Sequence, residues 1–184
     1  MRAVFTSDEF YADEARFALV KSPAEYVVGA LKSLESDVDF GRSGNNASPN
    51  SQMSLMGQVL LAPPDVAGWD GGLAWINTTT LLSRANFGEL VATDRVQDGR
   101  GYYVNVDGLL AGENTPTANK LVDVFLDRMG PIDLSKKKKK PLKNYVLFDD
   151  AGHKQDFVLD TTTRDKKVRG LIHLIMTLPE YHVN

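Results

Sequence analysis

Apolar residues recur at helical spacing most clearly between Thr115-Pro116 and Gly130-Pro131. The stripe in this segment consists of Ala118, Leu121, Val122, Phe125, Leu126 and Met129. Proline after a capping threonine is typical of a helix start, and a Gly-Pro pair is typical of a helix end. We therefore predict a helix over residues 116–129 that buries Leu121, Val122, Phe125 and Met129.

Two further segments begin with a serine followed by proline. Ser22-Pro23-Ala24-Glu25 has the pattern of a capping box, in which the glutamate reaches back to the free amide of the serine. The apolar stripe that follows predicts a helix from 23 to about 35. Ser48-Pro49 repeats the start signal and predicts a second helix over 49–61, which Pro63-Pro64 would end.

Less regular stripes predict a helix over residues 79–92 and a mostly apolar, buried helix over 168–178. Residues 102–106 and 157–159 have weak strand character and could form one small β-hairpin or no regular structure. The whole chain, residues 1–184, is thus predicted to be a single helical domain. Its expected fold class is all-α or mainly α, with about five to seven helices joined by long loops.

Three segments between these stripes have distinctive compositions. Residues 36–47 are polar and glycine-rich, which predicts a flexible connection, and residues 62–76 are rich in glycine, proline and tryptophan. We expect residues 62–76 to pack on the 49–61 and 79–92 helices because their connections are short. Lys136–Lys140 is a run of five lysines before Pro141, which in an acidic protein is usually a solvated loop.

The two ends of the chain carry similar segments. Residues 4–11, VFTSDEFY, and residues 175–182, IMTLPEYH, both have two apolar residues, a threonine and then a glutamate before an aromatic residue. Because the second follows a buried helix, we expect the first to follow an upstream helix that is missing from this sequence. Without that helix, the apolar side chains that would pack on it should form an exposed patch. We expect this patch to include Val4, Phe5, Val27 and Val28.

Composition excludes several classes of protein. A net charge of −3 argues against general nucleic-acid affinity, and no apolar run approaches the roughly 18 residues of a membrane span. Without cysteine the chain has no disulfide, no thiolate metal site and no cysteine nucleophile. We expect no cofactor and no metal.

The tryptophan-containing segment is the candidate ligand site. Indole faces stack on sugars and aromatic groups, and the neighbouring glycines allow close approach of a ligand to the backbone. The candidate ligand-binding residues are Gln58, Trp69, Asp70, Trp75, Asn77 and Arg84. The alternative is that both indoles fill the core. In that case Trp69→Ala should cost about 3–5 kcal/mol of stability.

Other polar groups match structural roles better than catalytic ones. Asp149, Asp150, His153 and Asp156 have no established metal-site spacing and suggest a polar turn around Gly152. His173 lies on an apolar helix and fits a core histidine, while His182 is expected to be exposed. No serine has the glycine pattern of a nucleophile elbow, so catalytic residues cannot be named.

Several motifs resemble the C-terminal part of the bacterial family known as Domain of Unknown Function 1800. They are residues 5–11 and 20–28, Met56-Gly57-Gln58, residues 63–72, Ala74-Trp75-Ile76-Asn77 with Leu81 and Arg84, and residues 168–175 with Pro179-Glu180-Tyr181. The chain departs from the family at Lys32, where the resemblance implies arginine. Family members are longer on the N-terminal side, and many resemble exported or periplasmic proteins.

The resemblance implies a shape and a location but no reaction. We expect a non-catalytic scaffold or binding module of a larger exported or envelope-associated bacterial protein. Its partner would be a carbohydrate or another protein, together with the missing N-terminal region. The alternative is a fragment of an enzyme, for example a hydrolase, with a site around Trp69 and Trp75.

Overall fold

The computed structural model describes residues 2–12, 15, 18–38, 48–93, 102–113, 115, 117–130 and 132–184. Within these ranges the chain is mainly α-helical, as the sequence predicts. The α-helices are α1 Arg2–Phe5, α2 Pro23–Ser33, α3 Pro49–Leu55, α4 Thr78–Ala92, α5 Val106–Leu110, α6 Ala118–Arg128, α7 Lys136–Leu147 and α8 Arg169–Met176. Short 3-10 helices cover Asp8–Tyr11, Gly72–Trp75 and Pro179–His182, and a π-helical segment, Thr163–Val168, leads into α8.

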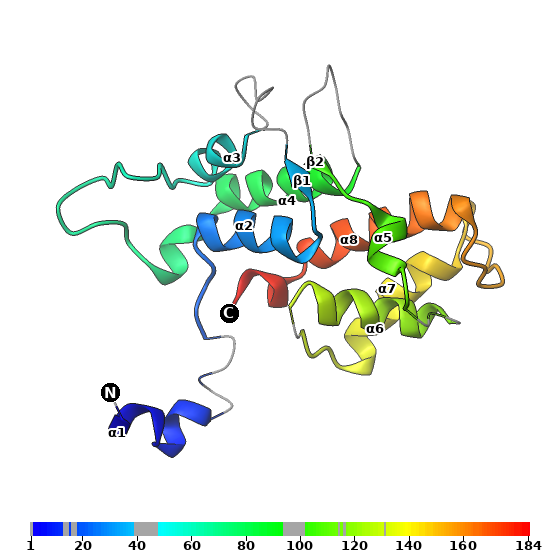
Figure 1. Cartoon of the computed structure of the whole chain (residues 1–184), viewed down its shortest axis with the longest axis horizontal. Helices are drawn as coiled ribbons and strands as arrows, with labels where there is room; N and C mark the ends of the chain where they lie inside the picture. The colour runs from blue at the N-terminus through cyan, green and yellow to red at the C-terminus, as the bar shows by residue number, and fades with distance from the viewer. Residues whose placement is uncertain are drawn as a thin grey trace.

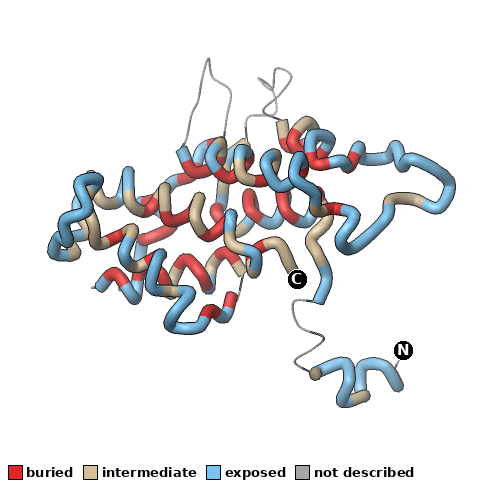
Figure 2. The backbone as a smooth tube through the Cα atoms, turned by 180° about the vertical axis from the view of Figure 1, so that it is seen from behind, coloured by how far each residue is buried: buried red, intermediate tan, exposed pale blue. Residues whose placement is uncertain are grey.

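Helix α8 lies at the centre of the molecule. It packs against α4, α6 and α7, and α2 packs against α3 (Figure 1). The apolar side chains of α8 that sequence periodicity marks are all fully buried: Leu171, Ile172, Ile175 and Met176. Figure 2 shows the buried residues concentrated where the helices face one another, so one continuous core supports the described helices.

Two glycines let helices approach α8 closely. A Cβ atom at Gly88 of α4 would lie 3.3 Å from Cδ2 of His173 and from Cβ of Met176, both on α8. A Cβ atom at Gly170 of α8 would overlap the ring and hydroxyl of Tyr145 on α7. A side chain at Gly88 would press His173 and Met176 apart by a few tenths of an ångström, whereas a side chain at Gly170 would have to displace Tyr145.

The predicted helix starts are confirmed where the signals were strongest. Ser22 and Glu25 form the capping box of α2, with the Glu25 amide donating to Ser22 Oγ (3.3 Å) and the Ser22 amide donating to Glu25 Oε2 (2.7 Å). Helix α6, by contrast, begins at Ala118 after a Thr117 cap, two residues later than the start predicted at Thr115-Pro116. Its predicted buried face is also confirmed, since Leu121, Val122, Phe125 and Met129 are at most 4% exposed.

The helix predicted over 49–61 is shorter than expected. Helix α3 ends at Leu55 because Gly57 adopts a left-handed conformation (φ +96°) and the Gln58 amide donates to the Met53 carbonyl (2.9 Å). This is the hydrogen-bond pattern of a Schellman cap, which glycine allows at no steric cost. Leu60 and Leu61 therefore lie outside the helix and are exposed.

The sequence correctly predicts a small antiparallel hairpin, but one of its two partners is wrong. Strand β2, Tyr102–Tyr103, pairs with β1, Asp37–Val38, and residues 157–159 form no strand. The buried Tyr102 ring packs edge-on against Phe87 of α4 (ring centroids 5.4 Å apart), which fixes β2 beside α4. The rest of the predicted flexible connection, residues 39–47, lies outside the described residues.

The lysine run is not a loop. Lys136–Lys140 form the first turns of α7, which Ser135 caps by accepting a hydrogen bond from the Lys138 amide (3.4 Å). Lys138 is paired with Glu180, and Lys139 with Asp123 of α6 at 2.8 Å. The lysine run misled the prediction because composition alone does not reveal a serine cap or partners from other helices.

Residues 2–11 form a separate unit, which we call the N-terminal hook. All of its described hydrogen bonds stay within the hook, and Val4, Phe5, Phe10 and Tyr11 are exposed. Figures 1 and 2 show the hook beside the body rather than within it. Val28 is also exposed, as predicted, but Val27 faces the core and is fully buried, so its place in the predicted patch is wrong.

The sequence similarity between the two ends corresponds to the same local structure. The Thr6 amide donates to Arg2 O and the Thr177 amide donates to His173 O, both at 3.1 Å. A four-residue 3-10 helix follows in each case. Tyr181 of the second segment is only 2% exposed, whereas Phe10 of the first is 45% exposed.

Candidate functional site

The segment from residue 57 to 77 projects from the body of the protein, and we call it the tryptophan arm. Figure 1 shows it as a long excursion between α3 and α4. Leu61, Val66 and Leu73 are each at least 80% exposed along its length. The prediction that residues 62–76 pack on the neighbouring helices is therefore wrong for the outer part of the arm.

The arm has an ordered turn at its outer part. Asp65 Oδ1 accepts a hydrogen bond from the Ala67 amide (2.7 Å), and Asp65 O accepts one from the Gly68 amide (3.2 Å). Gly68 has φ +97°, a conformation that favours glycine at this turn. These bonds hold the turn through backbone geometry and leave the neighbouring apolar side chains exposed.

The two indoles occupy different environments. Trp75 is 9% exposed and lies at the base of the arm, immediately before the cap of α4. Its carbonyl accepts a hydrogen bond from Thr80 Oγ1 (3.0 Å). Trp69 is half-buried and Asp70 is exposed, both within the arm. Trp75 therefore anchors the arm, and Trp69 is the indole with surface available to a ligand.

Two of the polar candidate residues hold helix ends. Gln58 Oε1 accepts a hydrogen bond from the Ala24 amide (2.8 Å), which satisfies a free donor in the first turn of α2. Asn77 caps α4, its Oδ1 accepting from the Thr80 amide (3.0 Å), while Thr80 Oγ1 accepts from the Asn77 amide (2.9 Å). The arm is thus fastened to α2 at one base and to α4 at the other.

Arg84, the sixth candidate, is fully buried. Its Nη2 donates to the Lys21 carbonyl (2.7 Å), and its guanidinium carbon lies 4.7 Å from the centre of the Tyr26 ring. Nη1 lies 3.4 Å from Nδ1 of His182, which accepts the bond because a guanidinium can only donate. Its Nε has no hydrogen-bond partner among the described residues.

We call Lys21, Tyr26, Arg84 and His182 the arginine cluster. The pKa of His182 is lowered to about 4, mainly by burial and also by the positive charges of Arg84 and Lys21. Burial also lowers the pKa of Lys21; the charge of Arg84 lowers it further, and the charge of Glu25 raises it. Burial raises the pKa of the Tyr26 hydroxyl. The expected exposure of His182 is therefore wrong: its ring is half-buried and neutral near neutral pH.

The structure thus divides the six predicted residues. Gln58, Trp75 and Asn77 fasten the arm, and Arg84 lies inside the arginine cluster. Trp69 and Asp70 are left on the arm. Sequence reasoning missed Lys21, Tyr26 and His182. The fold brings the segment with Lys21 and Tyr26 together with Arg84 of α4 and with His182 near the end of the chain.

The aspartate-rich segment after α7 forms a turn. Asp149 Oδ1 accepts hydrogen bonds from the amides of Ala151 (3.0 Å) and His153 (2.8 Å), around a left-handed Gly152. These bonds lower the pKa of the Asp149 carboxyl. Among the described residues no group of three or more histidine, cysteine or acidic side chains is placed to hold a metal ion.

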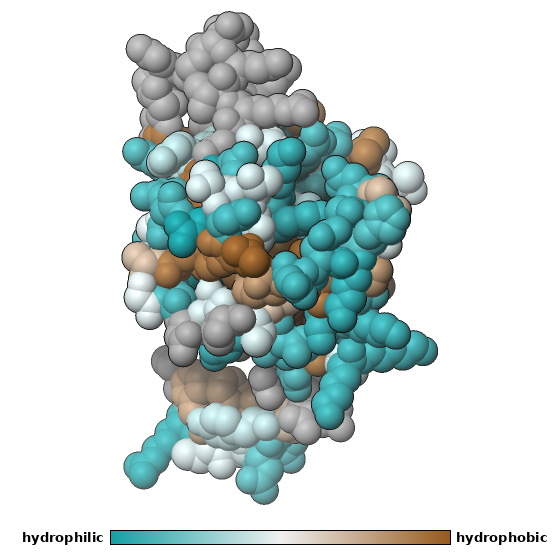
Figure 3. All heavy atoms as spheres, turned by 90° about the vertical axis from the view of Figure 1, so that its right-hand side faces the viewer, coloured by the Kyte–Doolittle hydropathy of each residue, from teal (hydrophilic) through white to brown (hydrophobic). Residues whose placement is uncertain are grey.

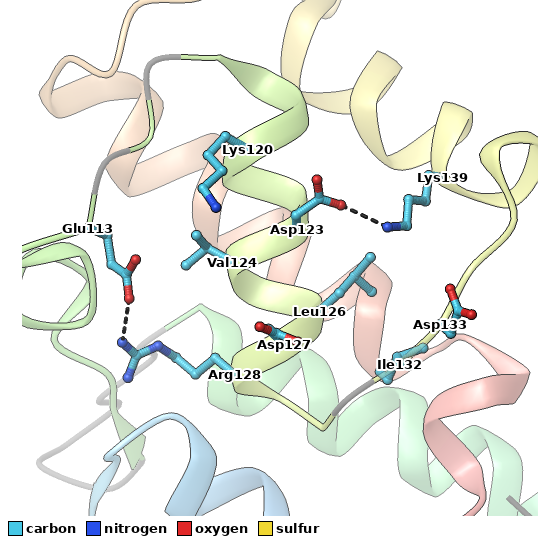
Figure 4. Close-up of a pocket in the computed structure, with 10 residues that line it drawn as sticks. All are labelled: Glu113, Lys120, Asp123, Val124, Leu126, Asp127, Arg128, Ile132, Asp133 and Lys139. Carbon is cyan, nitrogen blue, oxygen red and sulfur yellow. Dashed lines mark hydrogen bonds and ion pairs between the residues drawn. The ribbon is translucent and has the colours of Figure 1, made fainter. Parts of the chain in front are cut away.

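Two hollows flank α6. The first, of about 630 Å³, has acidic and basic side chains from both sides of the helix (Figure 4). In Figure 4, Asp123 of α6 and Lys139 of α7 point toward one another, and Glu113 faces Arg128. The second hollow, of about 890 Å³, lies between α6 and α7 and also includes Asp123 and Lys139. Neither hollow contains one of the six predicted site residues.

The fold and the site define a mainly helical domain with a projecting, tryptophan-containing arm and a buried arginine cluster at the arm's base. A family model described as "Protein of unknown function (DUF1800)" matches residues 1–183, so the chain belongs to this family. No curated protein and no solved structure matches the chain. None of the described helices is long and apolar enough to cross a membrane.

Proposed function

We propose that this domain is a non-catalytic binding module of a larger exported or envelope-associated bacterial protein, and that the tryptophan arm is its contact surface. The observation that carries the proposal is the exposure of the apolar side chains of the arm. Leu61 is 99% exposed, Leu73 is 80% exposed and Val66 is fully exposed. Exposed apolar surface of this kind is typical of a site that another molecule covers.

The chemistry of the arm favours a protein partner over a carbohydrate. Sugar sites combine an exposed indole face with several free polar groups, but Gln58 and Asn77 are already engaged at helix ends. Leucine and valine side chains on a projecting segment supply apolar contact area, which drives association between proteins. Trp69 then serves as the aromatic anchor, since indoles contribute strongly to protein interfaces.

A hydrolytic site would instead need available acid–base groups beside the indoles. The acid–base groups on the arm are two carboxylates, Asp65 and Asp70. Asp65 holds the turn by accepting the Ala67 amide (2.7 Å), and Asp70 is exposed on the surface rather than buried in a cleft. This arrangement supports the binding module over the enzyme fragment.

Site-specific photocrosslinking in the native host tests this proposal. A benzoylphenylalanine at position 61 or 73 should give one defined protein adduct, because both side chains lie on the proposed contact surface. Trp69→Ala should reduce the yield of that adduct. The matched control is position 158, where Val158 is 59% exposed but lies far from the arm in the sequence.

Equal adducts from positions 61, 73 and 158 would contradict the proposal. A titration of tryptophan fluorescence with cell-envelope oligosaccharides tests the carbohydrate alternative separately. If the oligosaccharides shift the emission of the parent but not of Trp69→Ala, the arm binds sugar and the protein-partner assignment is wrong.

A further inference from the structure

The hollow between α6 and α7 combines an apolar floor with a basic rim, and we call it the lysine groove. We call its apolar lining residues, Val122, Leu147 and Phe148, the floor, and its basic lining residues the rim. The rim consists of Lys136, Lys139, Lys140, Lys143 and Lys154, and one acidic residue, Asp123, also lines the groove. Figure 3 views the molecule from the right-hand side of Figure 1 and shows exposed apolar surface surrounded by hydrophilic side chains. The groove volume, about 890 Å³, suits a short peptide segment better than a single small anion.

The positive charge of the groove is largely uncompensated. Of the five lysines that line the groove, Lys139 pairs with Asp123. The other four, Lys136, Lys140, Lys143 and Lys154, form no ion pair with any described residue. Like charges spaced along one helix repel each other, so an acidic occupant would stabilise α7 as well as fill the groove.

The apolar floor excludes occupants that carry charge alone. A phosphate group would meet the lysines but would gain nothing from Val122, Leu147 and Phe148. A flat anionic membrane could not reach the floor of a groove. An acidic peptide with aromatic side chains satisfies both parts, because its rings cover the floor and its carboxylates meet the rim.

The N-terminal hook has this chemistry. Phe5, Phe10 and Tyr11 form an exposed aromatic group with edge-to-face contacts, the ring centroids lying 5.2 and 5.1 Å apart. Asp8 and Glu9 are exposed in the same turn. The hook also keeps its shape without the body, since Tyr11 Oη donates to the Phe5 carbonyl (3.0 Å). Little further ordering would be needed for it to bind.

The equivalent segment at the other end shows how such a hook is used. Residues 173–182 have the same sequence of hydrogen bonds, and there Ile175, Met176 and Tyr181 are all buried against the core. The corresponding Val4, Phe5 and Phe10 of the N-terminal hook are between 45% and 57% exposed. The hook therefore has the local structure of a segment that packs on the core, but its apolar face is uncovered.

We propose that the N-terminal hook of one copy of the chain docks in the lysine groove of a second copy. Phe5, Phe10 and Tyr11 contact the apolar floor, and Asp8 and Glu9 face the lysines of the rim. A second copy fits better than the same chain, because Figures 1 and 2 both show the hook and the α6–α7 pair on opposite sides of the molecule. Reciprocal exchange of hooks between two copies gives a closed dimer with twofold symmetry.

The test measures association of the full chain by sedimentation equilibrium. The parent should dimerise, and the dissociation constant should rise when salt increases from about 50 to about 500 mM, because screening weakens contacts between charges. Two double variants reverse the charges of the contact. The hook variant carries Asp8→Lys and Glu9→Lys, and the groove variant carries Lys140→Glu and Lys143→Glu. Each should weaken the dimer about tenfold or more. Mixing the two double variants should restore association, since each then offers the charge that the other lacks.

The control is a double variant with Lys32→Glu and Lys137→Glu. It makes the same change in net charge as Lys140→Glu with Lys143→Glu, but at two exposed lysines that do not line the groove. This variant should dimerise like the parent, and circular dichroism checks that every variant is folded. A parent that stays monomeric, or a control that loses association equally, would overturn the proposal. If the chain is monomeric and the NMR resonances of Phe10 shift when the groove charges are reversed, the hook binds the groove of its own chain. That result would overturn the second-copy assignment. Binding to phosphatidylserine vesicles without self-association would also overturn it.

Discussion

The ring of His182 stacks on the ring of Tyr26, with the ring planes 6° apart and the centroids 5.3 Å apart. Tyr26 comes from α2 and His182 from the last 3-10 helix, so this contact joins the two ends of the described body. The buried Tyr26 hydroxyl donates to the Met176 carbonyl (3.0 Å), and Tyr181 packs edge-on against the same ring. Burial beside Arg84 keeps His182 neutral, and this has a consequence for acid stability.

His182 should make the fold sensitive to acid between pH 6.5 and about 4. The unfolded chain binds a proton at His182 below pH 6.5, but the folded chain does so only below a pKa of about 4. Stability from this group is therefore complete above pH 6.5 and falls as the pH is lowered through that window, by on the order of 2 kcal/mol. His182→Phe keeps an aromatic ring without the titration, so its melting temperature should fall less steeply with pH.

The measurement is a series of thermal melts followed by circular dichroism across that pH range. His153→Gln is the matched control, because it removes an exposed imidazole from the turn around Gly152. It should keep the slope of the parent. If His182→Phe and the parent lose stability in parallel, His182 is not the group responsible.

Removing the charge of Arg84 should raise the pKa of His182. Arg84→Met retains bulk but removes the positive charge that opposes protonation of the ring. The pKa should rise from about 4 and still remain below 6.5, because burial is the larger cause of the shift. An NMR titration of the imidazole protons measures it directly.

Arg128→Met serves as the control for Arg84→Met. Arg128 also bonds to a backbone carbonyl, that of Leu109, but it belongs to an ion-pair group with Glu35 and Glu113. The pKa of His182 should not move in this variant. An unchanged His182 pKa in Arg84→Met would show that the arginine charge has no effect on the ring.

Local signals allowed much of the fold to be predicted, and the failures share a cause. The capping box at Ser22 and the stripe of α6 depend on residues within one or two turns, so the sequence contains the whole interaction. The pairing of β2 with β1 depends on a strand more than sixty residues away. The ion pairs of the lysine run depend on Asp123 and Glu180, which lie in other elements. Periodicity carries no information about such partners.

The candidate site was predicted in the same uneven way. The composition of residues 62–76 correctly marked an unusual segment, and Asn77 and Gln58 were marked because they stand beside it. Their roles as caps could not be separated from ligand binding without knowing which amides they face. The arginine cluster was missed because His182 and Arg84 are 98 residues apart.

The two indoles should contribute unequally to stability. Trp75 is 9% exposed at the base of the arm, so Trp75→Ala should lower the free energy of unfolding by about 3–5 kcal/mol. Trp69 is half-buried, and Trp69→Ala should cost about 1–2 kcal/mol, less than the sequence alone suggests. Urea unfolding followed by circular dichroism compares the two. Equal losses would mean that Trp69 is a core residue and would weaken its role in binding.

The close approach of α7 to α8 makes Gly170 the most restrictive of the described helical glycines. A methyl group at this position would overlap the Tyr145 hydroxyl and ring, so Gly170→Ala must displace Tyr145 or separate the helices. We expect a loss of about 1–3 kcal/mol in the free energy of unfolding, although alanine favours a helix by up to about 1 kcal/mol.

Gly29 in α2 provides the matched control, because a Cβ there would meet nothing within 4 Å and the residue is exposed. Gly29→Ala should therefore stabilise the protein by about 0.5–1 kcal/mol through helix propensity alone. Tyr145→Ala removes the ring that a side chain at position 170 would overlap. The double variant Gly170→Ala with Tyr145→Ala should therefore lose less free energy of unfolding than the two single variants added together. Urea unfolding of the four variants measures that coupling. If Gly170→Ala stabilises the protein as Gly29→Ala does, α7 and α8 are not in the close contact that brings Tyr145 over Gly170.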